Sequence, residues 1–318
     1  MIMVKVNPVE APEPGTRHGG HIPGTKDPAF TLNVPQSLAI PVVIAAPHGG
    51  RAYPDAIIAK MREPRWSMLR LEDRHVDTLA AEVATATGAI LLSAHAPRAM
   101  LDLNRAADDV DWAMIVGGKS AGRAVSRANH RAKGGLGLVP RRLAGLGDIW
   151  REALSKEELE ARIGAIHSPY HAVLGKTLEQ LRERWGAALL IDLHSMPPLK
   201  PSRAHPRAAE FVIGDRFGAS CHGFLADAAL RHLANVQRMV AHNRPYSGGY
   251  VLDHHSAPRR NIHGLQLEVC RSIYLDARME EPGPRLPAVA RQIGGLVRDL
   301  AFETITLGGG EQARQAAE

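Results

Sequence analysis

Cysteine and aromatic residues are scarce in this sequence. Two cysteines, Cys221 and Cys270, occur among 318 residues, which excludes a disulfide framework and leaves at most one bridge. Aromatic residues make up 4%, so we expect a core built mainly from Ala, Val, Leu and Ile. Apolar runs fall far short of the roughly 20 residues of a membrane helix, and the N-terminal segment lacks the apolar stretch of a signal peptide. The sequence therefore predicts a soluble, cytoplasmic protein.

Long runs of charge of one sign are also missing. The net charge is +6, but the densest basic clusters are two pairs, Arg141-Arg142 and Arg259-Arg260. Without a run of five or more Lys and Arg, the sequence does not favour nucleic acid as a partner. A basic cleft for a small anionic substrate accounts for the charge.

Short apolar runs alternate with segments of helical period. Strands are expected at 41–47, 89–95, 188–194, 210–215 and 264–269. Strands separated by helices indicate a single α/β domain over 39–307, a sandwich with a mostly parallel or mixed central sheet. An extended or partly ordered arm over 1–38 is expected before it, and a flexible tail over 308–318 after it.

Capping residues and apolar spacing predict three helix starts. Apolar residues over 69–83 share one helical face, and Ser67 is a suitable N-cap for that helix. Ser155 begins a capping-box pattern, which predicts a second start. Ser168-Pro169 predicts a third, so that the preceding helix would end there.

The segment from Met114 to Leu146 is rich in Gly and Arg. It is too long for an ordinary connection between elements, which indicates a functional lid or an excursion over a site. Its part over 117–147 matches no motif that assigns it a role.

Two histidines stand where predicted strands end. His48 lies in PHGG after the first strand, and His194 ends the strand ALLIDLH. Open α/β sheets bind ligands beyond the carboxyl ends of their strands, neutral His is the commonest nitrogen ligand of zinc, and Asp192 can orient His194. A third ligand is needed, and EDRHVD offers Asp73 or Glu72. The structural alternatives are capping or core histidines and carboxylates that favour a helix N-terminus.

Residues for substrate binding and proton transfer follow other apolar stretches. Asn104-Arg105, in LDLNR, can hold a carboxylate, or form a surface ion pair. Glu268, in the alternating GLQLEV, is a candidate general base, or an exposed strand carboxylate. YSGGY, with Tyr246, is a binding loop or a plain turn. No GxSxG elbow occurs and Cys270 has no His assigned to it, which argues against a serine or cysteine nucleophile.

Six motifs occur in the order PHGG, EDRHVD, DLNR, DLHS, YSGGY and LQLEVCRSIY. Over Val42 to Asp276 they resemble the N-formylglutamate amidohydrolase family, a relative of the zinc carboxypeptidases and aspartoacylases. The resemblance implies a zinc-carboxypeptidase-like fold, a three-layer α/β/α sandwich with a mixed central sheet. It also implies a metal-dependent amidohydrolase acting on a linear amide. Family members in histidine degradation hydrolyse N-formyl-L-glutamate to formate and L-glutamate.

The resemblance also implies roles for the site residues. The predicted ligands of one Zn²⁺ per chain are His48, Asp73 and His194. The predicted catalytic residues are Glu268 and Arg105. The predicted substrate-binding residues are Asn104, Arg105, Tyr246, Gly248, Gly249 and Arg271.

The pattern departs from the zinc carboxypeptidases at one point. Their first ligands are spaced HxxE, whereas Arg51 stands three residues after His48. The carboxylate ligand must therefore come from elsewhere, and the choice between Asp73 and Glu72 stays open. Two functional alternatives stay open as well: a carboxypeptidase-like peptidase or other N-acyl amino acid hydrolase, and a catalytically silent ligand-binding homologue.

Overall fold

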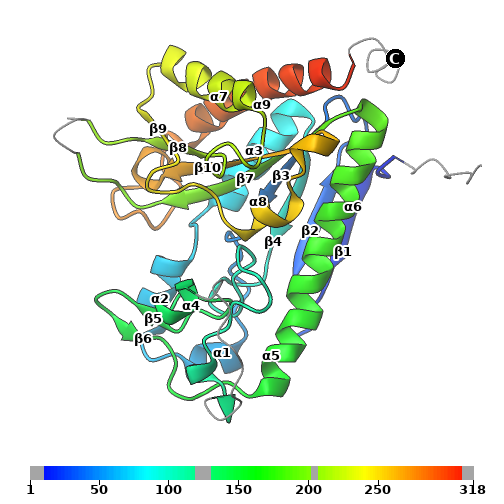
Figure 1. Ribbon diagram of the computed structural model, residues 1–318. Coiled ribbons are helices and arrows are strands. Elements are labelled where there is room, and N and C mark those ends of the chain that lie inside the picture. The colour runs from blue at the N-terminus through cyan, green and yellow to red at the C-terminus, as the bar shows by residue number, and fades with distance from the viewer. Residues whose placement is uncertain (1–10, 119–129, 202–206, 310–318) are drawn as a thin grey trace, which may run out of the picture.

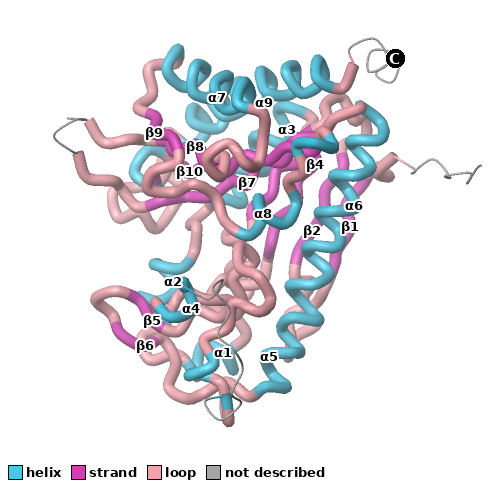
Figure 2. Tube along the Cα trace, viewed as in Figure 1, coloured by secondary structure: helices cyan, strands magenta, loops and turns pink. Residues whose placement is uncertain are grey.

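The computed structural model describes residues 11–118, 130–201 and 207–309 (Figure 1 and Figure 2). The strands are β1 (Gly15–Gly19), β2 (Phe30–Val34), β3 (Val42–Ala46), β4 (Ile90–Ala94), β5 (Arg142–Leu143), β6 (Gly147–Asp148), β7 (Ala188–Met196), β8 (Phe211–Gly214), β9 (Val240–His242) and β10 (Ile262–Cys270). The α-helices are α1 (Asp55–Lys60), α2 (Pro64–Leu71), α3 (Val76–Thr87), α4 (His130–Lys133), α5 (Lys156–Arg162), α6 (Ser168–Trp185), α7 (Gly223–Asn235), α8 (Tyr250–His255) and α9 (Leu286–Leu307). The shorter helices are the 3₁₀-helices η1 (Trp112–Met114), η5 (Pro258–Arg260) and η6 (Arg271–Ile273), and the π-helix η4 (Ile163–His167).

Eight strands form one mixed sheet in the order β1-β2-β4-β3-β7-β10-β8-β9. The central strands β4, β3, β7 and β10 run parallel to one another. Antiparallel pairs flank them, because β2 pairs with β4 on one side and β8 with β10 on the other. The carboxyl ends of the four central strands therefore meet at one edge of the sheet.

The sheet separates two hydrophobic cores. Side chains alternate along β3, so that Val43 and Ala45 face one core while Val42 and Ile44 face the other. Helices α6 and α8 cover the first core, and α3, α7 and α9 cover the second (Figure 1). The prediction of a three-layer α/β/α sandwich with a mixed central sheet is confirmed, and the central strands are apolar throughout because both of their faces are buried.

The helix expected after Ser67 is in fact two helices, so that prediction is wrong. Ser67 lies buried inside α2, which ends at Leu71, and α3 begins only at Val76. Leu71 packs in the first core and Val76 in the second. One straight helix cannot serve both faces of the sheet, and the chain turns between them through His75, whose φ is 55°.

The helix start at Ser155 is confirmed, but the break at Ser168-Pro169 is not. Ser155 Oγ accepts a hydrogen bond of 3.0 Å from the N–H of Glu158. Helices α5, η4 and α6 follow one another without interruption, and Ser168 has helical φ and ψ of −59° and −48°. Pro169 has no N–H to donate to the preceding turn, and the wider π turn before it accommodates that missing bond.

Part of the segment assigned to an N-terminal arm belongs to the sheet. β1 pairs with β2, and β2 pairs with β4. Phe30 is buried, and its ring meets that of Tyr170 edge-on with centroids 5.5 Å apart. The alternation in FTLNV is the signal that identifies β2. The sheet thus begins before residue 39, while residues 1–10 and 310–318 lie outside the described residues.

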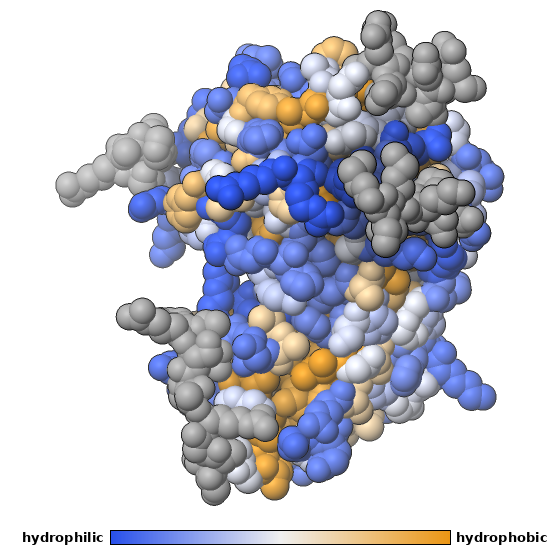
Figure 3. Space-filling model, turned by 45° about the vertical axis from the view of Figure 1, so that its right-hand side comes forward, coloured by the Kyte–Doolittle hydropathy of each residue, from blue (hydrophilic) through white to orange (hydrophobic). Residues whose placement is uncertain are grey.

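A lower lobe, formed by α1, α2, α4, β5 and β6, lies below the sheet in Figure 1. It is tied together by contacts such as the 2.8 Å hydrogen bond from the N–H of Arg62 to the carbonyl of Ile149. The Gly- and Arg-rich segment contributes α4 and β5 to this lobe, and its residues 119–129 lie outside the described residues. Figure 3 shows a mostly hydrophilic face with a hydrophobic area on its lower part. Among the described helices, none is long and apolar enough to span a membrane.

Candidate metal centre and active site

The candidate site lies at the carboxyl edge of the sheet. His48 follows the end of β3, and His194 and Glu268 are opposite each other on the neighbouring parallel strands β7 and β10. Asp73 stands in the turn between α2 and α3, and its N–H donates a 3.0 Å hydrogen bond to the carbonyl of His48. The turn that separates the two helices therefore delivers Asp73 to the strand ends.

The two glycines after His48 allow a close approach of the chain to its neighbours. A Cβ on Gly49 would lie 2.8 Å from the Cβ of Asp77, and one on Gly50 would overlap the carbonyl oxygen of Ala96. The glycines thus make room for these neighbours.

Each candidate histidine ligand is held at Nε2 by a buried carboxylate. Nε2 of His194 lies 2.9 Å from Asp192 Oδ2, which is the contact expected from the sequence. Nε2 of His48 lies 2.7 Å from Asp102 Oδ1. Because an ionised carboxylate only accepts, each Nε2 donates, and this tautomer leaves Nδ1 for other chemistry. Asp102 is the part that sequence reasoning missed, although DLNR places it two residues before Asn104.

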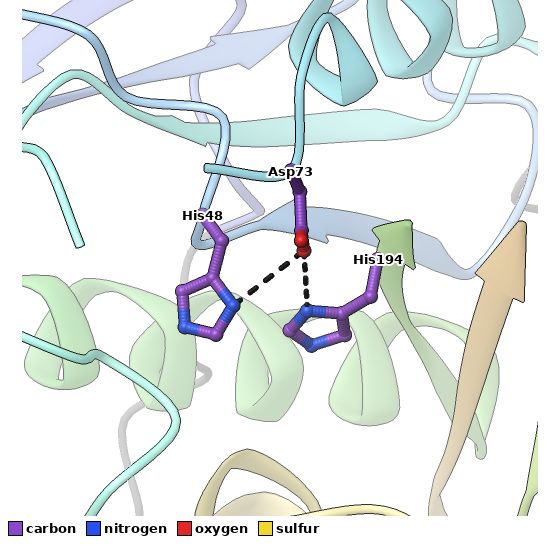
Figure 4. Close-up of side chains that lie close together, drawn as sticks. All are labelled: His48, Asp73 and His194. Carbon is purple, nitrogen blue, oxygen red and sulfur yellow. Dashed lines mark hydrogen bonds and ion pairs between the residues drawn. The ribbon is translucent and has the colours of Figure 1, made fainter. Parts of the chain in front are cut away.

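The Nδ1 atoms of both histidines face Asp73 (Figure 4). Asp73 Oδ2 lies 3.0 Å from Nδ1 of His194 and 3.5 Å from Nδ1 of His48. The ligand atoms of the three residues all lie within 4.8 Å of one another. Glu72, the other candidate carboxylate, instead accepts a 2.8 Å hydrogen bond from Arg74 Nη1. The geometry therefore favours Asp73 over Glu72.

This donor set fits a divalent metal ion such as Zn²⁺. Two imidazole nitrogens and one carboxylate form a ligand set found in catalytic zinc sites. Nδ1 of His48 is buried without a hydrogen-bond partner in the described part of the chain, which is expected of a ligand atom. Burial lowers the pKa of His194, but Asp192 and Asp73 outweigh it and hold that pKa well above its usual range. The surroundings of the three residues therefore favour positive charge.

Arg271 braces the candidate metal ligand Asp73. Its Nη2 lies 3.3 Å from Asp73 Oδ1, and its Nε donates a 3.0 Å hydrogen bond to Ser195 Oγ. Two backbone carbonyls, those of Leu69 and Glu72, accept further hydrogen bonds from its guanidinium. Most of its donors are thus engaged by the protein.

Glu268 is buried beside the histidines and held by a neighbour on its own strand. Gln266 Nε2 donates a 3.0 Å hydrogen bond to Glu268 Oε1. Both side chains lie on one face of β10, as the two-residue period requires. Burial raises the pKa of Glu268 to about 7; the positive charge of His194 opposes this shift, and the negative charge of Asp73 adds to it. The sequence did not single out Gln266, although the alternation in GLQLEV places it beside Glu268.

Asn104 and Arg105 connect the site to α8 and to the lower lobe. Asn104 Oδ1 accepts a 2.9 Å hydrogen bond from the N–H of Val251, while its Nδ2 lies 3.4 Å from Nε2 of His194. Arg105 Nε donates to the carbonyl of Leu136 at 2.9 Å. Its Nη2 lies 3.9 Å from Asp102 Oδ2, which is too long for a hydrogen bond, and Arg105 lines the cavity described below.

The site residues predicted from the sequence line one cavity of about 200 Å³. The predicted site residues on its wall are His48, Asp73, Asn104, Arg105, His194, Tyr246, Gly248, Gly249, Glu268 and Arg271. The residues that were not predicted are Arg70, Arg98, Arg131, Ser195, Pro197, Ser247 and Gln266. YSGGY is therefore part of the wall of the cavity.

Asp77 and His75, which also belong to EDRHVD, pair with residues other than the three candidate ligands. Asp77 forms a two-bond ion pair with Arg51 at 3.0 and 2.9 Å. His75 Nε2 lies 3.2 Å from Glu281 Oε2. Cys221 and Cys270 are both free, so the bridge that the sequence left open is not formed.

Comparisons with known proteins agree with the motifs. The family model described as N-formylglutamate amidohydrolase matches residues 40–275. An N-formylglutamate deformylase from Pseudomonas aeruginosa is 28% identical over 85% of this chain and 94% of its own length. One from Pseudomonas putida is 30% identical over 74% of this chain and 82% of its own length. The crystal structure of N-formylglutamate amidohydrolase from Ralstonia eutropha, 30% identical, superposes with a TM-score of 0.75 over 87% of this chain and 98% of that one.

Proposed function

This chain belongs to the N-formylglutamate amidohydrolase family, and on that premise we propose that it hydrolyses the formyl C–N bond of N-formyl-L-glutamate with one Zn²⁺ per chain. One observation carries the proposal. His48, Asp73 and His194 converge beside Glu268 at the wall of a cavity lined with arginines. This arrangement suits a small anionic amide.

The three convergent residues would hold the ion. A bound Zn²⁺ supplies Lewis-acid polarisation of the formyl oxygen and lowers the pKa of a water molecule. Asp102 and Asp192 keep both histidines in the tautomer that offers Nδ1 as a lone pair. Arg271 holds Asp73 in place from its other oxygen.

Glu268 moves the proton. Its carboxylate accepts a proton from the attacking water, whose oxygen then forms a bond to the formyl carbon. The C–N bond breaks, and Glu268 returns the proton to the leaving nitrogen, which gives formate and L-glutamate. Gln266 fixes one oxygen of Glu268, so the other remains for this transfer.

Asn104 and Arg105 would hold the α-carboxylate of the substrate. Arg105 presents Nη2, and Asn104 is fixed by the N–H of Val251. Tyr246, Gly248 and Gly249 form the wall beside them. Fixing the carboxylate positions the formyl carbon against the attacking water, and this positioning lowers the barrier. The charge of Arg105 also favours the oxyanion that develops during attack.

The test measures metal content and formate release on one preparation of the full chain. We expect about one zinc per chain and formate release from N-formyl-L-glutamate that is lost on chelation and restored by added zinc. N-acetyl-L-glutamate and a dipeptide ending in glutamate, assayed in parallel, test the other hydrolase activities. Zinc binding without formate release would contradict the substrate assignment, and absence of both would contradict the whole proposal.

A further inference from the structure

The cavity wall carries more positive charge than the reaction requires. Its arginines are Arg70, Arg98, Arg105, Arg131 and Arg271, whereas its carboxylates are Asp73 and Glu268. Binding of one divalent ion by Asp73 and the histidines would increase this excess of positive charge further. A substrate with a single negative charge would leave it largely unbalanced.

Three of the arginines are committed to protein partners. Arg98 Nε donates a 2.9 Å hydrogen bond to Asp102 Oδ2, and Arg271 pairs with Asp73 at 3.3 Å. Arg105 is buried, and two backbone carbonyls accept hydrogen bonds from it. Of these three, Arg105 is the one proposed above to bind the α-carboxylate.

The other two, Arg70 and Arg131, are exposed at the rim. Arg70 Nη1 donates to the carbonyl of Ala144 at 2.5 Å, which orients its guanidinium without neutralising it. Neither arginine has a carboxylate partner within residues 11–118, 130–201 and 207–309. The positive charge of Arg131 also acts on the buried Arg105. Burial lowers the pKa of Arg105 most, and the positive charges of Arg98 and Arg131 lower it further.

We propose that Arg70 and Arg131 form a second anion subsite, which binds the side-chain carboxylate of the substrate and selects N-acyl derivatives of acidic amino acids. This inference rests on the proposed function, because it places the formyl group at the metal centre and the α-carboxylate at Arg105. Both rim arginines come from the lower lobe, from α2 and α4. Recognition of the side-chain carboxylate is thus assigned to the lower lobe, and hydrolysis of the amide to residues at the edge of the sheet.

The chemistry of the subsite predicts which compounds it distinguishes. N-formyl-L-glutamine has the shape of N-formyl-L-glutamate but lacks the second charge, so it cannot form charge-assisted hydrogen bonds with the two guanidinium groups. Each such bond is expected to contribute about tenfold or more in binding.

The experiment compares the zinc-loaded wild type with Arg70→Gln, Arg131→Gln and the double variant on both compounds. Arg65→Gln is the matched control, because Arg65 is also an exposed arginine of α2 but does not line the cavity. We expect kcat/KM for N-formyl-L-glutamate to fall about tenfold or more in each single variant, mainly through KM. Turnover of N-formyl-L-glutamine should change less than about threefold. An equal loss on both compounds would overturn the subsite while leaving the proposed function intact.

Calorimetric titration with glutarate and butyrate separates the subsite from catalysis. We expect the wild type to bind the dicarboxylate more tightly than the monocarboxylate, and the double variant to lose that difference. If the wild type releases formate from neither compound, the proposed function fails, and this titration alone decides the subsite. A preference for glutarate that survives in the double variant, or is absent from the wild type, would overturn it.

Discussion

At the scale of single residues, the candidate site depends on two carboxylates that do not line its cavity. Asp102 and Asp192 are fully buried, and each accepts a hydrogen bond from Nε2 of a histidine. This contact fixes both the orientation of the ring and the position of its proton. Replacing such a carboxylate by the neutral amide of Asn keeps the shape of the side chain but makes it a weaker hydrogen-bond acceptor, so the histidine tautomer is fixed less strongly.

Asp192→Asn is therefore expected to weaken zinc binding by about 10–100-fold. The dissociation constant, measured by competition with a chromogenic chelator, is the direct readout. Asp77→Asn is the control, because Asp77 lies close to Gly49 but pairs with Arg51 and contacts none of the three candidate ligands. Equal affinities for wild type and Asp192→Asn would show that the tautomer is set in another way.

Glu268→Gln should remove turnover and keep the metal. The amide cannot take a proton from water, so kcat for formate release should fall by about 100-fold or more. Zinc content should stay at the wild-type level, because Glu268 is not among the three convergent residues. Glu160→Gln, an exposed helix position paired with Lys156, controls for the loss of one carboxylate. Activity close to that of the wild type would exclude Glu268 as the base.

At the scale of elements, loops position what the strands present. The turn between α2 and α3 supplies Asp73, and the first turn of α8 carries the N–H that fixes Asn104. Gly249 is packed directly against Asn104, since a Cβ at this position would lie 2.5 Å from Asn104 Oδ1. Glycine is therefore needed at this position because there is no space for a side chain. Backbone conformation is not the reason, since any residue can adopt its φ of −130°.

Gly249→Ala should displace Asn104 and reduce kcat/KM for N-formyl-L-glutamate by about tenfold or more, because small shifts of a positioning group are costly in catalysis. Zinc content should be unchanged. Gly223→Ala is the control, since a Cβ on Gly223, at the start of α7, meets nothing within 4 Å. If both variants keep wild-type kinetics, Asn104 does not position the substrate.

At the scale of the whole molecule, a group of histidines joins α6 to α8. His171 Nδ1, from α6, lies 2.9 Å from Nε2 of His255, from α8, and both side chains are buried. Burial, followed by the charges of neighbouring histidines including His167 and His254, lowers the pKa of His171 to about 2 and that of His255 to about 3. Both are therefore neutral in the folded chain well below neutral pH.

The free energy of unfolding should fall as the pH drops below about 6.5, because the unfolded chain then binds protons that the folded chain cannot. Above that pH both states are neutral and the two histidines contribute no pH dependence. Between about pH 6 and 4 each contributes up to about 1.4 kcal/mol per pH unit.

Denaturant unfolding of the zinc-free chain measures this slope. The double variant His171→Gln/His255→Gln should show a shallower loss of stability with acid, whereas His21→Gln, at an exposed position, should keep the slope of the wild type. Identical slopes for the wild type and the double variant would contradict the assignment.

Much of the fold could be predicted from local pattern. The strand predictions at 41–47, 89–95 and 188–194 match β3, β4 and β7, because buried parallel strands are apolar on both faces. The helix boundaries predicted near Ser67 and Ser168 were wrong, because packing decided them. Near Ser67, the chain packs into both cores and therefore breaks between α2 and α3, although the apolar spacing continues across the break. Near Ser168, one buried face continues through Pro169, so the helix does not end there.

The sequence by itself determined which residues could carry the chemistry, because strand ends, glycine pairs and ordered motifs are written in neighbouring positions. It singled out His48, His194 and Glu268 as candidates, and it limited the third candidate ligand to Glu72 or Asp73. Only the tertiary structure favours one of those two, Asp73, since the choice depends on which side chain the turn after α2 directs at the histidines. The tertiary structure also revealed Asp102 as a partner of His48 and the arginines at the rim, because contacts between residues far apart in the chain leave no periodic signal in the sequence.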